Sequence, residues 1–205
     1  MADVIKLPEP VIKGYMSVEE ALYRRRSIRE YLNIPLTLAE VSQLLWASQG
    51  ITDRTYNKYR TAPSAGALYP LTVYLTAGRV EGLREGLYRY NPHRHEIIAM
   101  SYGDKRKEIY KYALFQDSIV QASAVLIFTA DYSITMRKYG ERGIRYVLME
   151  IGHASQNVYL QATALGLGTV AIGAFYDEEI KEALGIPNNE DVLYLMPIGK
   201  AKWKA

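Results

Sequence analysis

The 205-residue chain contains no cysteine, which excludes disulfide bonds, thiolate-bound metals and cysteine nucleophiles. The net charge is also small, at +3, because 25 Lys and Arg residues are nearly balanced by 22 Asp and Glu residues. The basic residues are scattered except for one cluster at Arg24, Arg25 and Arg26. We therefore do not expect a general nucleic-acid-binding surface, and the cluster needs its own explanation.

A long uninterrupted hydrophobic run is missing as well. The most apolar long stretch, residues 144–167, includes Arg145, Glu150 and His153. It predicts a buried helix and not a membrane span, since charged residues are costly within a bilayer. The first ten residues carry Asp3, Lys6 and two prolines where a signal peptide would be apolar. We expect a cytoplasmic protein with no membrane contact.

Histidine is rare, with only three in the chain. His93 and His95 flank Arg94 at a predicted hairpin tip with no third metal ligand nearby, so we expect both on the surface. His153 lies inside the long apolar helix, where a hydrogen-bonded interface role is more common than catalysis. No hydrolytic triad can be assembled, and we predict no metal site.

The sequence patterns predict a soluble globular fold of the α+β class. Hydrophobic residues make up 49% of the chain and charged residues 23%, and the length suits a single domain spanning 1–205. We predict an extended arm at 1–16, a candidate for contact with a partner subunit, and a loop at 51–70. Capping boxes predict helices beginning at Ser17 and Thr37, the second ending at Gly50, and further helices are expected at 104–114, 144–166 and 177–185. Strands are expected at 71–77, 87–90, 96–100, 122–130, 169–174 and 192–198.

Helix 144–166 is apolar almost all round, so it must be covered on all sides. A chain of 205 residues has difficulty providing that cover alone. A homodimer whose central helices pack together about a two-fold axis is the simplest solution.

The basic cluster is the first candidate for ligand binding. Arg25 and Arg29 are four positions apart and share a face if the first helix persists, with Arg26 and Ser27 facing elsewhere. Guanidinium groups and a hydroxyl at a helix end suit a phosphate with a polyol tail. From these residues alone, a solvated basic helix end that complements the helix dipole remains the simpler interpretation.

The second candidate is the segment Pro63-Ser64-Ala65-Gly66-Ala67-Leu68-Tyr69-Pro70. Its small residues would let the backbone approach a flat ligand closely, although an ordinary turn before a strand fits equally. A third segment, 166–174, is glycine-rich but lacks the order of a dinucleotide fingerprint and the Gly-Lys-Ser/Thr of a phosphate loop. It is most simply a helix end followed by a core strand.

Taken together, these segments resemble the nitroreductase family, and most closely its SagB-type dehydrogenase branch, which includes the azoline oxidases of peptide-modifying clusters. The resemblance covers nearly the whole chain. Single motifs are weak, but their order and spacing are specific. They are Arg25-Arg26-Ser27-x-Arg29, the 63–70 segment, Glu150-x-Gly152-His153-x-x-Gln156-Asn157, Gly166-Leu167-Gly168 and Pro197-Ile198-Gly199.

The resemblance implies a central, mostly antiparallel sheet flanked by helices, with FMN bound between the two subunits of a homodimer at the long buried helix. Arg25 would pair with the FMN phosphate, and Arg26 and Ser27 would contact phosphate or ribityl oxygens. Arg29 would lie near flavin N1 and O2, where reduction leaves negative charge that a fixed cation stabilises.

The resemblance assigns the remaining flavin contacts to three other segments. Pro63, Ser64, Ala65, Gly66 and Leu68 would touch the ring edge, from the other subunit. The backbone at Ile172 and Gly173 would lie over the ring near N5, and Lys200 or Lys202 would assist with the phosphate.

Arg137-Lys138-Tyr139 resembles the Lys-Tyr pair that azoline oxidases use to remove a proton. Lys138 and Tyr139 are therefore candidate catalytic residues, because dehydrogenating a ring requires loss of a proton with the hydride. In a chain with 18 tyrosines, such neighbours also occur without a catalytic role.

The expected activity is that of an FMN-dependent oxidoreductase. It would take a hydride from NADH or NADPH onto flavin N5 and pass electrons to a small molecule such as a nitroaromatic or quinone. Two alternatives are direct oxidation of a peptide or other organic substrate, as in the SagB-type branch, and a non-catalytic flavin-binding subunit.

Overall fold

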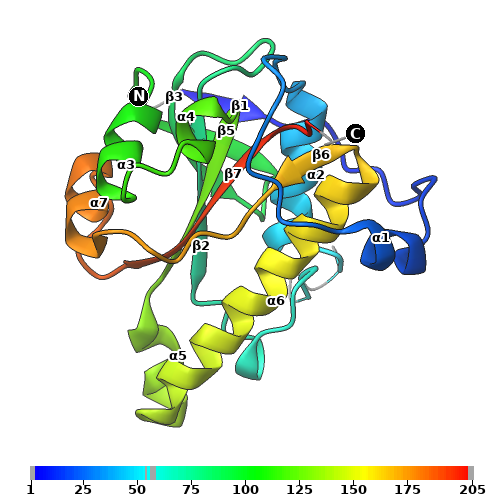
Figure 1. Ribbon diagram of the computed structural model, residues 1–205. Helices are drawn as coiled ribbons and strands as arrows, with labels where there is room; N and C mark the ends of the chain where they lie inside the picture. The colour runs from blue at the N-terminus through cyan, green and yellow to red at the C-terminus, as the bar shows by residue number, and fades with distance from the viewer. Residues whose placement is uncertain (1–2, 54, 56–58, 203–205) are drawn as a thin grey trace.

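The computed structural model describes residues 3–53, 55 and 59–202 of the chain. Its centre is a seven-stranded sheet of order β1-β4-β3-β2-β5-β7-β6, in which every neighbouring pair is antiparallel (Figure 1). The strands are β1 (Val4–Lys6), β2 (Leu71–Ala77), β3 (Gly86–Asn91), β4 (Glu96–Tyr102), β5 (Ala124–Ala130), β6 (Leu167–Thr169) and β7 (Asp191–Lys200). The α+β class with an antiparallel sheet is confirmed.

Helices cover both faces of the sheet. They are α1 (Val18–Arg24), α2 (Leu38–Gln49), α3 (Arg106–Tyr112), α4 (Ser118–Gln121), α5 (Tyr132–Tyr139), α6 (Arg142–Ala164) and α7 (Asp177–Leu184), with a short 3₁₀ turn η1 (Ala65–Ala67). The capping box predicted at Thr37 is present. The Thr37 hydroxyl accepts the N–H of Glu40, and the Glu40 carboxylate accepts the N–H of Thr37.

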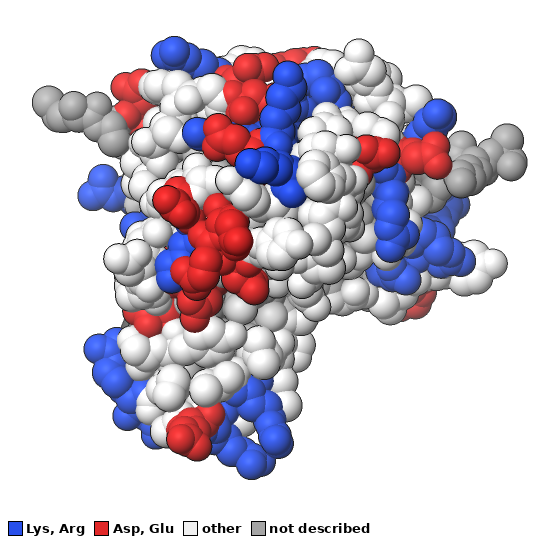
Figure 2. Space-filling model, turned by 60° about the vertical axis from the view of Figure 1, so that its left-hand side comes forward, with Lys and Arg blue, Asp and Glu red and all other residues white. Residues whose placement is uncertain are grey.

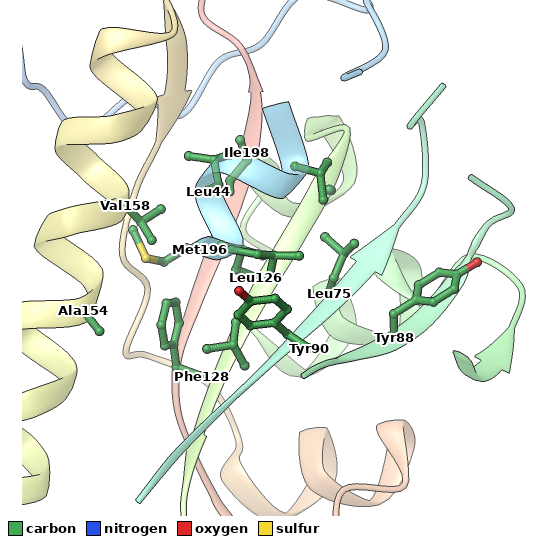
Figure 3. Packing of buried hydrophobic residues seen from close by; sticks show 14 of the residues in the cluster. Leu44, Leu75, Tyr88, Tyr90, Leu126, Phe128, Ala154, Val158, Met196 and Ile198 are labelled. Atoms are coloured by element: carbon green, nitrogen blue, oxygen red, sulfur yellow. The ribbon is translucent and has the colours of Figure 1, made fainter. Parts of the chain in front are cut away.

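The core lies on the two faces of the sheet, and successive residues of β5 supply each face in turn. Leu126 and Phe128 face α2 and α6, where Val158 of α6 packs with them (Figure 3). Val125 and Ile127 face α3, α4 and α7. The continuous apolar run predicted a strand buried on both faces, and this is confirmed.

The first helix does not persist into the arginine-rich segment. It ends at Arg24, and Arg25 has extended backbone angles of φ −52° and ψ 126°. Arg25 and Arg29 would share a helix face only if this helix persisted through both, and it does not. The extended backbone allows the N–H of Ile28 to donate to the carbonyl of Thr169 over 2.9 Å, so pairing with the edge of the sheet replaces a helical turn.

Two other boundaries differ from expectation. The strand predicted at 169–174 is instead β6, which ends at Thr169, and beyond it only Ile172 bridges to Leu195 of β7. Ala171 donates its N–H to the Tyr159 hydroxyl of α6 instead of to a strand. Helix α5 was not predicted; its eight residues make a short segment, from which a helix is hard to recognise.

The expectation that His95 is a surface residue is wrong, while His93 is exposed as expected. His95 is buried, with Nε2 2.8 Å from Ser42 Oγ and Nδ1 2.9 Å from the Tyr90 hydroxyl. The N-terminal arm is the reason: it is extended as predicted, but β1 pairs with β4 of its own chain, and the following residues cover His95. Among the described helices, none is long and apolar enough to cross a membrane.

Candidate functional site

The predicted ligand-binding residues gather in two places along helix α6. We call the first the arginine cluster, comprising Arg25, Arg26, Ser27 and Arg29. The second is the 63–70 loop, which includes η1 and ends where β2 begins.

Backbone hydrogen bonds hold the arginine cluster against the end of the sheet. The segment that carries it bonds from Ile28 to Thr169, from Leu32 to the carbonyl of Lys200, and from Lys202 back to the carbonyl of Glu30. Gly168 is needed for this approach, because a Cβ there would lie 2.6 Å from the Ile28 side chain. The cluster is thus fixed by its backbone while the side chains of Arg26, Ser27 and Arg29 are exposed.

Tyr159 of α6 connects the arginine cluster to the 170–173 segment. Its hydroxyl is 3.1 Å from Ser27 Oγ and accepts the N–H of Ala171 over 2.7 Å. The guanidinium of Arg25 lies 5.2 Å from the centre of the Tyr159 ring, within cation–π distance. Sequence reasoning missed Tyr159, and the one available signal was a hydroxyl within an apolar helix, which needs a polar partner.

The 170–173 segment therefore lies beside the arginine cluster, as the resemblance requires. Ile172 exchanges two backbone hydrogen bonds with Leu195, of 2.9 and 3.0 Å, and its side chain is buried. Gly173 is exposed and close to the Tyr194 ring, which an added Cβ would approach to 3.4 Å. Gly173 therefore presents exposed backbone without a side chain, which a flat ligand could approach closely, next to the hydrogen-bonded Ile172.

The ammonium groups of Lys200, the last residue of β7, and Lys202 are paired with carboxylates. Lys200 Nζ forms an ion pair with Glu40 Oε1, and Lys202 Nζ lies 3.7 Å from Glu30 Oε2. Their positive charge is partly neutralised in this arrangement.

The 63–70 loop has a strained backbone. Gly66, Ala67 and Tyr69 have φ angles of 64°, 54° and 52°, in the left-handed region that costs a non-glycine residue roughly 1–2 kcal/mol. The loop is stabilised from within by Ser64, whose Oγ accepts the N–H of Tyr69 over 2.9 Å.

Lys138 and Tyr139 lie directly against this loop. A Cβ at Gly66 would be 2.8 Å from both Lys138 Nζ and the Tyr139 hydroxyl, so a larger residue there would require these two side chains to move. The structure thus brings together the two candidate catalytic residues and the loop predicted to touch the ligand, although over 70 positions separate them in the sequence.

A buried acid, Glu150, and a half-buried guanidinium, that of Arg60, lie next to the same loop. Glu150 of α6 is 3% exposed, and Arg60 places its guanidinium 4.3 Å from the centre of the Tyr69 ring while donating to Gln49 Oε1 over 2.9 Å. Burial raises the pKa of Glu150 to about 7, against the opposing effects of a hydrogen bond with the Ser64 side chain and the charge of Arg60. Burial also lowers the pKa of Arg60. Sequence reasoning named Glu150 only as part of a motif; an acid in an apolar helix was the signal.

The two places are separated along α6. The arginine cluster contacts the helix at Tyr159 and the 63–70 loop contacts it at Glu150, nine residues earlier. Nine residues correspond to about 14 Å along a helix and to two and a half turns, so these side chains leave α6 on opposite sides. Within one chain, the two sets of residues do not converge on a single ligand.

The solvent side of α6 carries large apolar residues. Ile144, Leu148 and Met149 are 41%, 51% and 52% exposed. Val18 and Tyr23 of α1 are exposed as well. The three residues of α6 lie within two turns of the helix, and apolar residues grouped at the surface in this way are typical of a surface that binds another protein.

Charges of both signs occur on the face shown in Figure 2, with basic side chains gathered over the projecting end of the molecule, formed by α5 and the start of α6. The exposed basic residues of this end are Arg137, Lys138, Arg142 and Arg145. In the described part of the chain, no group of three or more acidic or histidine side chains is placed to hold a metal ion.

Comparison with known proteins gives consistent results. Residues 22–200 match the family model described as "Nitroreductase family". A protein from Methanocaldococcus jannaschii that is named as a nitroreductase is 48% identical over 200 residues, covering 98% of both chains. A nitroreductase crystal structure from Ralstonia eutropha superposes with a TM-score of 0.85 at 28% identity, covering 98% of this chain and 90% of the other. The trifolitoxin operon protein TfxC of Rhizobium leguminosarum bv. trifolii is 26% identical over 88% of this chain and 54% of its own length.

Proposed function

The chain belongs to the nitroreductase family of oxidoreductases, and from this premise we propose that it is an FMN-dependent enzyme working as a homodimer with flavin between its subunits. The observation that carries the proposal is the placement of its two sets of candidate ligand-binding residues on opposite sides of α6. A two-fold axis would place the arginine cluster of one chain opposite the 63–70 loop of the other. The exposed apolar residues of α1 and α6 would then be covered by the partner.

The residues of the arginine cluster fit a flavin mononucleotide. Arg25, fixed over Tyr159, and Arg26 supply guanidinium groups for the phosphate, and Ser27 supplies a hydroxyl for phosphate or ribityl oxygens. Arg29 would place a positive charge near N1 and O2 of the ring, where it would stabilise the reduced form. Lys200 and Lys202 would add charge at longer range, since each is held by a carboxylate.

The remaining contacts would come from bare backbone. Ile172 and Gly173 offer a rigid segment that a ring could lie against. From the partner, Pro63, Ser64, Ala65, Gly66 and Leu68 would contact the ring edge, where the small side chains of this loop allow close approach. Bound FMN would supply the hydride-accepting centre that no side chain of the chain can provide.

We propose NADH or NADPH as the reductant and a nitroaromatic or quinone-type small molecule as the acceptor. The name of the M. jannaschii relative supports a nitro compound. The cytoplasmic location and the single-domain organisation expected from the sequence fit this function and stay predictions.

A second candidate function is the direct oxidation of a peptide or another organic substrate. The observation that favours it is the position of Lys138 and Tyr139 against Gly66. Lys138 Nζ would take the proton from the substrate carbon, with the Tyr139 hydroxyl beside it, and bound FMN would supply the acceptor for the hydride.

The visible spectrum of the purified protein with added FMN, before and after anaerobic NADH or NADPH, tests the proposal. A flavin band that bleaches is the expected result. A bound flavin that does not bleach would favour the second candidate function or a non-catalytic flavin-binding subunit. A protein that binds no flavin would contradict the proposed function.

A further inference from the structure

Three buried polar atoms beside the 63–70 loop have no hydrogen-bond partner among the described residues. They are Gln49 Nε2, Arg60 Nε and Glu150 Oε1. An unpartnered oxygen makes an ionised carboxylate costly in a buried position, which favours a neutral carboxyl group. Arg60 acts in the opposite direction, because its positive charge favours the ionised form. Glu150 is therefore held between its two protonation states by its surroundings.

The protonation state of Glu150 affects the loop through its hydrogen bond with the Ser64 hydroxyl. A serine hydroxyl has one hydrogen to donate and two lone pairs that accept. The N–H of Tyr69 already occupies one lone pair. An ionised Glu150 can only accept, so it takes the single hydrogen of Ser64. A protonated Glu150 can donate to the second lone pair, which leaves the Ser64 hydrogen free to point away from the helix.

Other charged and titratable groups surround the pair. Arg60 faces it from the segment after α2, with Tyr69 of the loop and Tyr90 of β3 around that guanidinium. On the α5 side, Lys138 and Tyr139 contact Gly66, and the Tyr139 ring packs 5.1 Å from Tyr146 of α6. Among these groups, Arg60 acts on Glu150 by its charge, while burial raises the pKa of Glu150 to about 7. Both protonation states are consequently populated near neutral pH.

We propose that Glu150 is a positioning residue that acts through Ser64, so that its proton decides whether the Ser64 hydroxyl can donate a hydrogen bond to the flavin edge. The inference rests on the proposed function, because it takes the ligand of the 63–70 loop to be FMN. Glu150 itself touches no ligand. The pH thus determines, through the protonation state of Glu150, whether the Ser64 hydroxyl hydrogen is available to the flavin.

The affinity for FMN, measured by flavin fluorescence at pH 6 and pH 8, tests this assignment with Glu150→Gln. A glutamine amide donates to Ser64 at every pH, so this variant mimics the protonated acid. We expect equal dissociation constants for the wild type and the variant at pH 6. At pH 8 the wild type should bind about fivefold more weakly than the variant, the effect of about one hydrogen bond. Titration of the FMN phosphate cancels in this ratio.

The exposed Glu141, at the N-terminal end of the same helix, provides the matched control. Glu141→Gln removes one carboxylate from α6 without reaching the loop, so it should follow the wild type at both pH values. Ser64→Ala offers a second variant that keeps the buried carboxylate. The ratio of its FMN dissociation constant to that of Glu150→Gln should be the same at pH 6 and pH 8.

A readout without flavin tests the proton on Glu150 directly. Its pKa is raised from 4.5 to about 7 in the folded chain, so the folded state binds this proton more tightly than the unfolded state. The urea-unfolding free energy of the flavin-free wild type should therefore fall as pH rises from about 4.5 to about 7. Glu150→Gln should remove that fall, whereas Ser64→Ala should retain it.

The possible failures are distinct. A wild type that binds FMN with the same pH dependence as Glu150→Gln would overturn the role of Glu150 and leave the proposed function intact. A wild type that binds no FMN at either pH would overturn both. An unfolding profile that Glu150→Gln leaves unchanged would show that Glu150 holds no proton near neutral pH, which also rejects the inference.

Discussion

The arginine cluster and the 63–70 loop flank the same helix, yet the chain supports them by opposite means. The arginine cluster has an ordinary extended backbone, clamped to β6 and β7 by main-chain hydrogen bonds, with charged side chains directed to solvent. The 63–70 loop has three residues with positive φ and almost no charge of its own. Its support comes from Ser64 inside the loop and from buried Glu150 and half-buried Arg60 next to it.

The difference corresponds to what each region would recognise. Charged groups for a phosphate are best kept at the surface, where they remain solvated until the ligand arrives. Close contact with a flat ring needs small side chains and an unusual backbone, and a strained backbone persists only where its surroundings hold it. The strain and the buried charges thus lie in one region, and the solvated charges lie in the other.

The largest expected effect on flavin binding comes from one substitution in each region, with the two substitutions placed in different subunits of a dimer. Gly66→Val should abolish flavin binding, because a branched side chain at a φ of 64° would collide with Lys138 and Tyr139. Arg25→Glu should abolish it by repelling the phosphate. Dimers mixed from the two variants should regain flavin in about a quarter of all sites, since half of random dimers are mixed and each contains one intact site.

Differently tagged subunits allow the mixed dimers to be purified and their flavin content measured by absorbance. Homodimers of each variant are the controls and should stay colourless. If the mixed dimers are colourless too, the two regions do not form one site across a subunit interface.

Arg25→Ala should have the next largest effect. Loss of charge-assisted hydrogen bonds of roughly 1.5–3 kcal/mol would weaken FMN binding about tenfold or more. Arg24→Ala is the matched control, because Arg24 ends α1 one position earlier and pairs with Glu20 over 2.7 Å. Fluorescence titration measures both variants, and equal affinities for the two would refute the phosphate contact at Arg25.

A smaller effect is expected for Tyr159→Phe, which keeps the ring under Arg25 but removes the hydroxyl shared by Ser27 and Ala171. Leaving these groups without a partner should reduce the unfolding free energy by about 1–2 kcal/mol and weaken FMN binding by less than tenfold. Tyr23→Phe, at an exposed tyrosine of α1, is the control for chemical denaturation. A variant as stable as the wild type would mean that Tyr159 does not organise the arginine cluster.

Local signals predicted much of the fold. The capping residues of α2, the alternation in β2 and the apolar run of β5 were interpreted correctly, because each depends on neighbours in the sequence. Local signals did not show where α1 ends. The hydrogen bond from Ile28 to Thr169 competes with the helix, and it connects positions that lie far apart in the chain. Part of the loop predicted at 51–70, residues 54 and 56–58, lies outside the described residues.

Candidate ligand-binding residues were predicted as separate segments, and the sequence by itself determined their chemistry. Guanidinium groups, small loop residues and a bare glycine are properties of residue types and of their neighbours in the chain. Only the tertiary structure decided that Tyr159 would join Arg25 to Ala171, that Glu150 would lie against Ser64, and that Gly66 would face Lys138. The same holds for His95, which the N-terminal arm buries. The physical reason is that burial and long-range hydrogen bonds depend on the packing of the whole chain, which neither local patterns nor residue types specify.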